Sequence, residues 1–174
     1  MKLQSQPGDP GDGENVVAAF KKFLMRITLT PAGTAIDRVI TRLTGWSLVS
    51  AVFAFSIGIP YQTSLCLMTI GKRTGRLRKA VLPYRQMGDA YVLIGSFGGA
   101  KRHPAWALNM MAHPIAWVWV ARRQRPVRVE LLEGEERQRV FDEITLGRGP
   151  YVRYQKMALP RQLPVFRLTP FERD

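Results

Sequence analysis

The residues between positions 71 and 78 have the types and spacing that bind an anion. Gly71 and Gly75 lie four residues apart, which favours a tight loop with free backbone N–H groups. Thr74 adds a hydroxyl, and the segment supplies four cationic side chains: Lys72, Arg73, Arg76 and Arg78. Guanidinium groups fit phosphate and carboxylate oxygens in pairs. The spacing therefore predicts an anion cradle, although a solvated basic hairpin would carry the same residues.

A glycine loop and a short helix follow the cradle along the chain. The run Ser96-Phe97-Gly98-Gly99 permits the backbone to approach a planar ring closely. Pro104 begins a predicted helix on which Trp106 and Asn109 lie three residues apart and so share one face. A core tryptophan and a local amide cap are the ordinary alternatives for these two residues.

Side chains that catalyse reactions unaided are scarce. His103 and His113 are ten residues apart and fit no metal-binding pattern, and the sequence has no nucleophile elbow, Rossmann fingerprint or Walker A motif. Between residues 61 and 128 the only acid is Asp89, which leaves no carboxylate pair for acid–base catalysis. We expect no metal site, and we expect a cofactor to supply the chemistry if the chain is an enzyme.

Composition places these residues in a compact basic domain. The chain has 174 residues, 46% of them hydrophobic, and one cysteine, which excludes an internal disulfide or a cysteine-based zinc site. Its net charge of +13 favours nucleic acid, an acidic membrane surface or a polyanionic small ligand. Residues 61–128 hold twelve basic residues and one acid, so most of the net charge lies there. A second basic cluster, Arg122–Arg128, either extends the groove or forms a solvated turn.

The N-terminal part of the chain divides into two segments. The composition of residues 1–13 predicts a disordered leader, and the pattern of a signal peptide is not expected there. Residues 14–60 predict an amphipathic helix with a basic edge over 14–27, a second helix from Pro31 to Gly45, and an uncharged apolar stretch over 46–60. That stretch is too short to span a bilayer. It is either a buried helix or strand, or a surface that touches lipid or a lipophilic substrate.

Residues 61–174 alternate short strands with helices. Strands are predicted at 64–70, 78–86, 90–95, 115–121, 126–132 and 165–168, with a basic turn at 122–125. Helices are predicted at 104–112, 134–144 and 150–157. This pattern is typical of a small, mostly antiparallel barrel or sandwich.

In their order along the chain, the motifs resemble the deazaflavin (F420)-dependent nitroreductase family, whose members bind coenzyme F420 in a split β-barrel related to flavin-binding barrels. The matching runs lie within residues 62–170 and comprise Leu67–Gly75 with Arg78, Gly88-Asp89, Ser96–Gly99, His103–Asn109, Ala112–Pro114, Pro150–Gln155 and Pro164–Pro170. The resemblance implies an α+β fold: a small split β-barrel, FMN-binding-like, with peripheral helices and an N-terminal helical extension. It also implies an F420-dependent oxidoreductase that transfers a hydride.

The resemblance implies roles for individual residues. The phosphate and acidic tail of the coenzyme should be held by Lys72, Arg73, Thr74, Gly75 and Arg78. The deazaflavin ring should be lined by Val81, Ser96, Phe97, Gly98, Trp106 and Asn109. Tyr151 and Tyr154 occupy positions where the family places tyrosines near the substrate, and a phenol there could hydrogen-bond to the substrate or donate a proton.

The sequence departs from the family on the substrate side. Ala107, Pro83 and Arg148 stand where aromatic residues occur in family members, so the acceptor is expected to differ from a prodrug type. The apolar stretch 46–60 replaces a segment that is usually basic and glycine-rich. It suggests a lipophilic acceptor, such as a quinone-like, nitro or enone compound or an acyl lipid.

Other functions stay open. A non-catalytic or lipid-binding basic barrel at the membrane surface would explain residues 14–60. A single-stranded nucleic-acid binder would use Trp106, Trp117 and Trp119 as stacking platforms, but alternation along a strand favours core positions for the last two. FMN or haem is an alternative ligand of the same barrel. The preferred hypothesis has no nucleic-acid partner and a cytoplasmic location, with membrane contact at the inner face through residues 14–60. It leaves open a homodimer, which is common among related flavin barrels.

Overall fold

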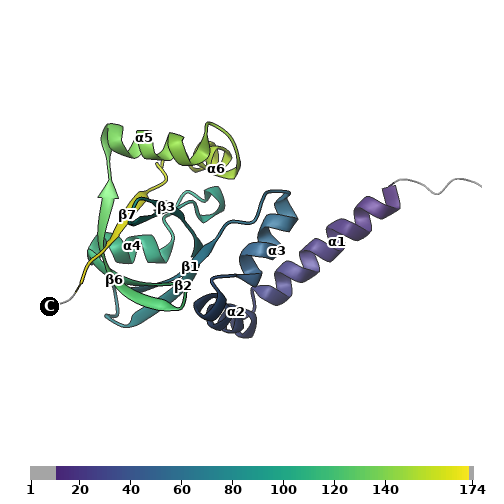
Figure 1. The fold of residues 1–174 in the computed structure, drawn as a ribbon. Coiled ribbons are helices and arrows are strands. Elements are labelled where there is room, and N and C mark those ends of the chain that lie inside the picture. The colour runs from purple at the N-terminus through teal and green to yellow at the C-terminus, as the bar shows by residue number, and fades with distance from the viewer. Residues whose placement is uncertain (1–10, 173–174) are drawn as a thin grey trace, which may run out of the picture.

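The sheet closes on itself because its two edge strands are neighbours in the chain. The computed structural model describes residues 11–172, with side chains from residue 19 onward. Its strands are β1 (Ser64–Ile70), β2 (Leu77–Pro83), β3 (Arg85–Met87), β4 (Ala90–Ile94), β5 (Ile115–Val120), β6 (Arg123–Leu132) and β7 (Val165–Pro170). They pair antiparallel in the order β2-β1-β5-β6-β7-β4-β3. Only Tyr84 separates the edge strands β2 and β3, so the sheet curls into the expected split barrel (Figure 1).

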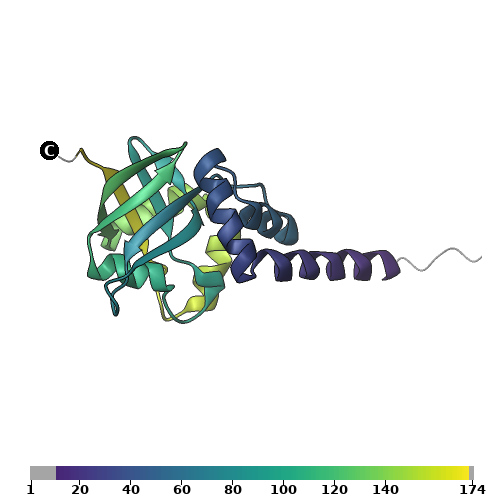
Figure 2. The same ribbon diagram turned by 90° about the horizontal axis from the view of Figure 1, so that it is seen from below.

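Helices cover two sides of the barrel. They are α1 (Gly11–Thr28), α2 (Pro31–Thr44), α3 (Leu48–Ile57), α4 (Ala105–Ala112), α5 (Gly134–Thr145) and α6 (Pro150–Ala158), with a 3₁₀ turn η1 (Phe97–Gly99). Figures 1 and 2 show α1, α2 and α3 grouped on one side of the barrel, with α1 projecting away from it. Helices α5 and α6 lie together on another side. The expected N-terminal helical extension and peripheral helices are therefore confirmed.

Alternation along the strands sets the core. On β5, Ala116 and Val118 are fully buried inside the barrel, where Leu65, Leu93 and Phe166 meet them. Trp117 and Trp119 have the opposite parity and are only half-buried on the outer face. The expectation that these tryptophans belong to the core is wrong, because the narrow barrel interior takes the small residues of this strand.

Local capping explains the two helices that precede the barrel. Thr30 accepts a hydrogen bond from the Gly33 N–H at 3.0 Å, and Pro31 follows at the first position of α2. Helix α2 ends at Gly45, which has a φ of +75°. The apolar stretch 46–60 contains a helix, α3, whose N-cap Ser47 accepts from the Ser50 N–H at 3.0 Å.

Buried polar contacts attach these helices to one another and to the barrel. The Asp37 carboxylate on α2 is buried and accepts hydrogen bonds from the Ser47 hydroxyl and the Val49 N–H at the start of α3. A carboxylate is favourable there because the helix N-terminus carries a partial positive charge. The Arg122 Nε donates to the Leu43 carbonyl at 2.6 Å, which joins α2 to the turn between β5 and β6.

Several predicted boundaries shift. Helix α1 begins at Gly11 rather than at residue 14, and residues 1–10 of the expected leader lie outside the described residues. The predicted strand 78–86 is two strands, broken at Tyr84. The predicted basic turn 122–125 is wrong, because β6 already begins at Arg123. The turn there consists of Ala121 and Arg122, which have φ values of +47° and +66°.

Among the described residues, no single helix has both the length and the apolar composition of a bilayer span. Helices α2 and α3 would reach that length together, but they meet at a bend of 104°.

Candidate active site

The basic loop between β1 and β2 has a closed backbone. The Gly71 N–H donates to the Arg76 carbonyl at 2.9 Å, and the Gly75 N–H donates to the Gly71 carbonyl at 2.8 Å. A Cβ atom on Gly71 would lie 3.1 Å from that Arg76 carbonyl oxygen, and Gly75 has a φ of +65°. Both glycines are therefore required by the turn, and the cationic side chains between them point outward as exposed groups.

Helix α4 holds this loop in place through Asn109. The Asn109 Oδ1 accepts a hydrogen bond from the Lys72 N–H at 2.9 Å. Its Nδ2 donates to the Thr69 hydroxyl at 3.0 Å, in a buried setting. These two bonds tie the start of the cradle loop to α4. Asn109 also lines the cavity beside this loop (the cradle cavity), and its predicted contact with the coenzyme stays a prediction.

Among the described residues, no acidic side chain pairs with the cations of the cradle. All ion pairs of the described residues use Arg139 or Arg167, which belong to α5 and β7. A cavity of about 860 Å³ lies beside the loop. Among its lining residues are Lys72, Arg73, Thr74, Arg78, Lys79, Phe97, Trp106 and Asn109. Unpaired cations around an open cavity suit an anionic ligand.

The glycine loop after β4 presents free backbone donors. Phe97, Gly98 and Gly99 have φ values of +48°, +62° and +81°, so three successive residues are left-handed. Within the described chain, the N–H groups of Phe97 and Gly98 have no hydrogen-bond partner, whereas the Gly99 N–H donates to the Ser96 carbonyl. A Cβ atom on Gly99 would lie 2.9 Å from the Met157 Cβ, so the loop packs tightly against α6.

A slot joins the cradle to a third cavity. This slot of about 210 Å³ shares Phe97, Pro104 and Trp106 with the cradle cavity. Trp106 stands beside the core residue Phe166, with the ring centroids 5.8 Å apart. On its other side the slot shares Pro83, Ser96 and Tyr151 with an apolar cavity. The three spaces therefore lie next to one another and share walls, and together they are called the groove.

The apolar cavity is built partly by the N-terminal helices. It has a volume of about 260 Å³. Helices α1 and α3 and the turn after α1 contribute Met25, Leu29, Val49, Ser50, Phe53 and Ala54. The barrel, the glycine loop and α6 contribute Val81, Pro83, Ser96, Gly98, Tyr151 and Tyr154, among others. Part of the stretch 46–60 thus walls the apolar cavity, and its predicted contact with lipid or a lipophilic substrate stays a prediction.

Tyr151 stands where the slot meets this apolar cavity. Burial raises the pKa of the Tyr151 phenol to about 12, with a smaller contribution from Tyr154. The phenol therefore keeps its proton throughout the neutral range. A neutral phenol beside an apolar cavity can donate a hydrogen bond to a carbonyl oxygen of a bound molecule.

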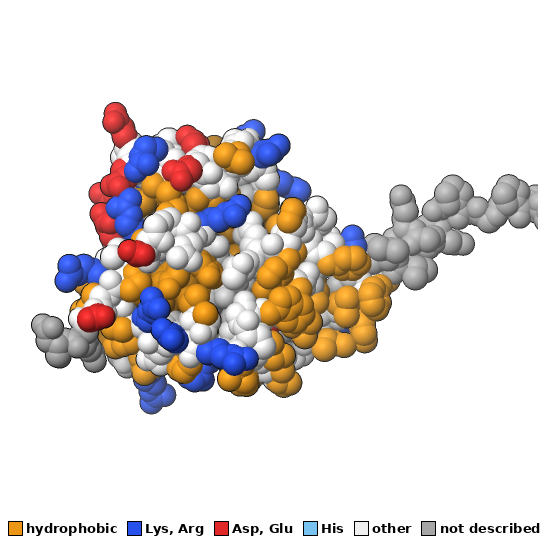
Figure 3. All heavy atoms as spheres, viewed as in Figure 1, with side chains coloured by type: hydrophobic (Ala, Val, Ile, Leu, Met, Phe, Trp, Pro, Cys, Tyr) orange, Lys and Arg blue, Asp and Glu red, His pale blue; other side chains and the backbone are white. Residues whose placement is uncertain are grey.

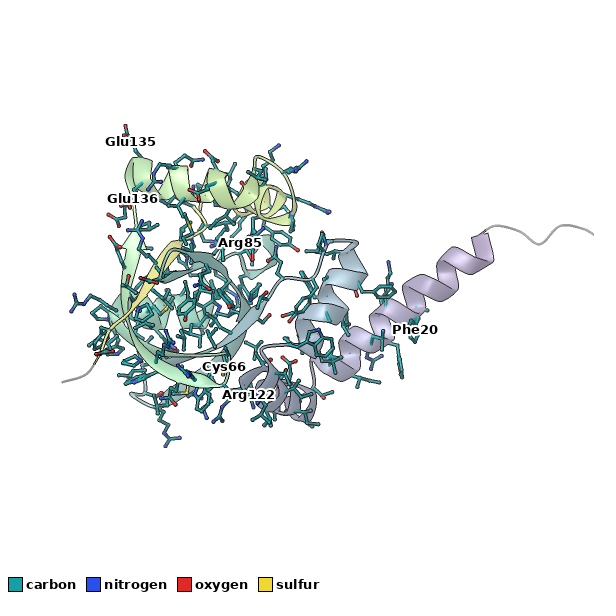
Figure 4. All side chains as sticks on the ribbon, in the orientation of Figure 1. Phe20, Cys66, Arg85, Arg122, Glu135 and Glu136 are labelled. Carbon is teal, nitrogen blue, oxygen red and sulfur yellow. The ribbon has the colours of Figure 1, made fainter. Side chains whose placement is uncertain are left out.

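The second basic cluster does not belong to this groove. Cys66 pairs with Trp119 and Met68 with Trp117, so the β5–β6 turn lies at the Ser64 end of β1. The cradle lies at the opposite end, after Ile70. Figure 4 places Arg122 beside α2, where it donates to the Leu43 carbonyl.

The structure gathers the sequence-predicted residues around one groove. Of the predicted cradle residues, Lys72, Arg73, Thr74 and Arg78 line its basic end, and Gly75 does not line it. The predicted ring residues line the slot and its two margins, and both tyrosines lie at the apolar end. Sequence reasoning missed the α1 contribution and Arg161, whose guanidinium holds the glycine loop. Within the described residues, no group of three or more His, Cys, Asp or Glu side chains could hold a metal.

A family model for F420H2-dependent quinone reductase matches residues 48–170, which is more than half of the chain. The chain belongs to this family. A relative of that name from Mycobacterium tuberculosis is 32% identical over 111 residues, covering 61% of this chain and 72% of the relative. This protein is therefore an oxidoreductase whose cofactor is coenzyme F420, and the resemblance to F420-dependent split-barrel reductases is confirmed.

Solved structures agree with this membership. An F420H2-dependent reductase is 29% identical in sequence and superposes with a TM-score of 0.54. The match covers 60% of this chain and 92% of that protein. A protein solved as a domain-swapped dimer is 24% identical in sequence, with a TM-score of 0.56. The match covers 78% of this chain and 94% of that protein. The second likeness concerns the fold alone.

Proposed function

We propose that this protein catalyses the F420H2-dependent reduction of a lipophilic, quinone-like acceptor. The supporting observation is the row of three adjoining cavities, in which the basic cradle borders the slot at Phe97 and Trp106, and the slot borders an apolar cavity. A coenzyme with a charged tail and a planar ring needs the first two parts. A lipophilic acceptor needs the third.

The cradle residues suit the phosphate and the acidic tail of the coenzyme. Lys72, Arg73 and Arg78 carry unpaired charge at the cradle cavity, and Thr74 adds a hydroxyl beside them. Gly75 serves by allowing the tight turn, since its φ is positive. In this proposal Asn109 acts through the cradle, because its Oδ1 accepts the Lys72 N–H.

The ring position lies between the glycine loop and the barrel. Ser96, Phe97 and Trp106 line the slot, while Val81 and Gly98 line its continuation toward α6. The unpaired N–H groups of Phe97 and Gly98 are the polar groups available to fix the ring edge. The apolar walls exclude water from the space next to it.

The acceptor end supplies orientation and a proton donor. When bound in its reduced form, the coenzyme supplies a hydride. Hydride transfer brings two electrons and one proton, so reduction of a quinone to a quinol requires one further proton, on the quinolate oxygen. We assign Tyr151 Oη to hydrogen-bond an acceptor oxygen and to deliver one proton, with Tyr154 placed beside it. The proton removed from Tyr151 must return from water after product release.

The test is acceptor-dependent oxidation of F420H2 by the purified protein, followed by the recovery of F420 fluorescence. We expect turnover with a menaquinone analogue and slower turnover with nitroaromatic and enone compounds of equal size. Reduced FMN at the same concentration serves as the cofactor control and should support no comparable rate. Turnover with nitro compounds only, or with FMN in preference to F420, would contradict the proposal.

We also propose that the N-terminal helices contact an anionic membrane surface. Phe20, Phe23 and Ile27 follow one face of α1 at helical spacing, and each is at least half exposed. The same spacing on α2 exposes Ile36, Val39 and Leu43. Figure 3 shows hydrophobic side chains gathered over this side of the molecule.

The basic residues of the N-terminal helices support an anionic lipid surface as the partner of this apolar face. Between residues 19 and 60 the chain carries five basic residues, and its one acid, Asp37, is buried. Basic groups beside an apolar helix face suit anionic headgroups. Because α1 and α3 also wall the apolar cavity, this contact would bring a lipid-dissolved acceptor close to the groove.

Vesicle co-sedimentation tests the membrane contact. The full chain should bind vesicles containing phosphatidylglycerol and should bind poorly to phosphatidylcholine vesicles. Changing Phe20, Phe23 and Ile27 to serine should abolish binding. Equal binding by that variant would contradict the proposal, as would a stable dimer that buries this face and binds no vesicles.

A further inference from the structure

All three nitrogens of the Arg161 guanidinium donate hydrogen bonds to carbonyl groups of the glycine loop. Its Nε and Nη2 donate to the Ala100 carbonyl at 3.0 and 2.6 Å. Its Nη1 donates to the Gly95 carbonyl at 3.1 Å, and its Nη2 donates to the Ser96 carbonyl at 2.9 Å. Three carbonyl groups of one short loop therefore point at a single cation.

The loop that Arg161 holds has an unfavourable backbone. Phe97 has a φ of +48°, a conformation that L residues with a Cβ atom rarely adopt, and Gly98 and Gly99 continue it. Such a conformation persists only where surrounding contacts determine it. Arg161 on one side and the Gly99 contact with α6 on the other supply those contacts.

The hydrogen bond from Arg161 to the Ser96 carbonyl also affects the Phe97 N–H, which is a free donor of the loop. The Ser96 carbonyl and the Phe97 N–H belong to one peptide group, in which the two bonds point in opposite directions. Because Arg161 binds the carbonyl side, the N–H faces away from it, and Phe97 lines the slot. A cation at the carbonyl oxygen polarises the peptide and strengthens its N–H as a donor.

Arg161 is itself fixed by the tyrosine helix. The Gln155 Nε2 on α6 donates to the Arg161 carbonyl at 2.9 Å, and the Gln155 Oε1 accepts the Leu163 N–H at 2.8 Å. Helix α6 also carries Tyr151 and Tyr154. The glycine loop and the tyrosines therefore share one anchor, which sets the distance between them.

We infer that Arg161 is a positioning residue for hydride transfer. It holds the glycine loop so that the polarised Phe97 N–H fixes the ring edge at a set distance from the acceptor position at Tyr151. This inference rests on the proposed function, because that proposal puts the ring in the slot. It predicts a larger effect on the rate at saturating coenzyme than on coenzyme affinity, because affinity comes mainly from the cradle.

Arg161→Met and Arg161→Lys test the inference, with Arg153→Met as a control on exposed α6. The first measurement is amide hydrogen exchange of the apoprotein. Segment 95–100 should exchange about tenfold faster or more in Arg161→Met, because charge-assisted hydrogen bonds to its carbonyls are lost. Arg161→Lys, which keeps the charge without the planar fork, should fall between, and Arg153→Met should match the wild type.

The second measurement is single-turnover oxidation of bound F420H2. Arg161→Met should lower the rate at saturating coenzyme by about tenfold to a hundredfold, with a smaller change in Kd. The cradle variant Lys72→Ala/Arg73→Ala should show the reverse pattern. An unchanged saturating rate in Arg161→Met, beside a wild type that reacts normally, would overturn the inference and leave the proposed function standing. Absence of coenzyme binding by the wild type would instead overturn the proposed function.

Discussion

The two basic clusters of this chain have similar composition and different surroundings. Lys72 to Lys79 flank a loop closed by glycines, line an open cavity and have no acidic partner within the described residues. Arg122 to Arg128 lie on and beside an extended hairpin, where Arg122 binds the Leu43 carbonyl of α2. Arg123 and Arg125 also line an open cavity, of about 1020 Å³, but Asp89 and Glu172 belong to the same lining. Charge density beside a cavity therefore does not by itself make an anion site. The cradle differs in its closed glycine loop and in a cavity lining that contains no carboxylate.

The largest expected difference between the clusters is in coenzyme affinity. Lys72→Ala/Arg73→Ala removes two charge-assisted contacts and should raise the Kd for F420 by about a hundredfold or more. Arg123→Ala/Arg125→Ala removes the same net charge from exposed positions of the other cluster and should change the Kd less than about threefold. Fluorescence titration measures both. Equal losses in the two variants would mean that only the overall field matters.

A pH experiment sharpens the contrast between the charged cradle and the neutral far end of the groove. The folded-state pKa of Tyr151 is raised from 10 to about 12, so its buried phenol stabilises the fold below pH 10, and this contribution is lost as the pH rises toward 12. The loss is at most about 3 kcal/mol. Chemical unfolding at several pH values should show a smaller alkaline loss in Tyr151→Phe than in the wild type. The same loss of unfolding free energy at alkaline pH in both proteins would contradict the raised pKa of Tyr151.

The anchor of the first cluster is Asn109. Asn109→Leu leaves the Lys72 N–H and the Thr69 hydroxyl without partners and should lower the free energy of unfolding by about 1–3 kcal/mol. Because the cradle loses its fixed position, the Kd for F420 should rise as well. Urea unfolding and coenzyme titration measure the two effects. A destabilised variant with an unchanged Kd would contradict the role of Asn109 in positioning the cradle for the coenzyme.

The anchor of the second cluster is Arg122, and a smaller effect is expected there. Arg122→Met removes an exposed hydrogen bond to α2 and should cost about 0.5–1.5 kcal/mol of stability. Limited proteolysis should cut between residues 28 and 62 more readily in this variant, while the Kd for F420 stays unchanged. A weakened Kd would place the second cluster in the coenzyme site and break the comparison.

The sequence predicted most of the barrel because its local signals were strong. The apolar run 64–70 ends at Gly71 and is β1 in the structure, and residues 115–120 alternate as β5. The turn between β5 and β6 was predicted too far along the chain, at 122–125, because neither Ala121 nor Arg122 is a glycine, although both have positive φ. Basic residues from Arg123 onward looked like a turn but occupy an exposed strand.

The cradle and slot residues were predicted from motif order, whereas contacts between distant segments were not. Nothing local shows that Met25 of α1 and Leu29 just after it wall the same cavity as Tyr151. Arg161 stands in a proline-containing segment that resembles a surface loop, yet it binds carbonyls more than sixty residues earlier in the chain. The contact of the Asn109 amide with the Lys72 backbone was not predicted, because it depends on the register between α4 and β1.

The most direct test of the central claim, that the first cluster holds the anionic part of the coenzyme, is the salt dependence of F420 binding. Raising the salt concentration from about 0.01 M to about 0.1 M shortens the screening length from about 30 Å to about 10 Å. We predict that the wild type and Arg123→Ala/Arg125→Ala lose affinity in parallel over this range, whereas Lys72→Ala/Arg73→Ala binds weakly and shows a smaller salt dependence, which comes from the remaining Arg78 and Lys79. A cradle variant that keeps the wild-type salt dependence would contradict the claim.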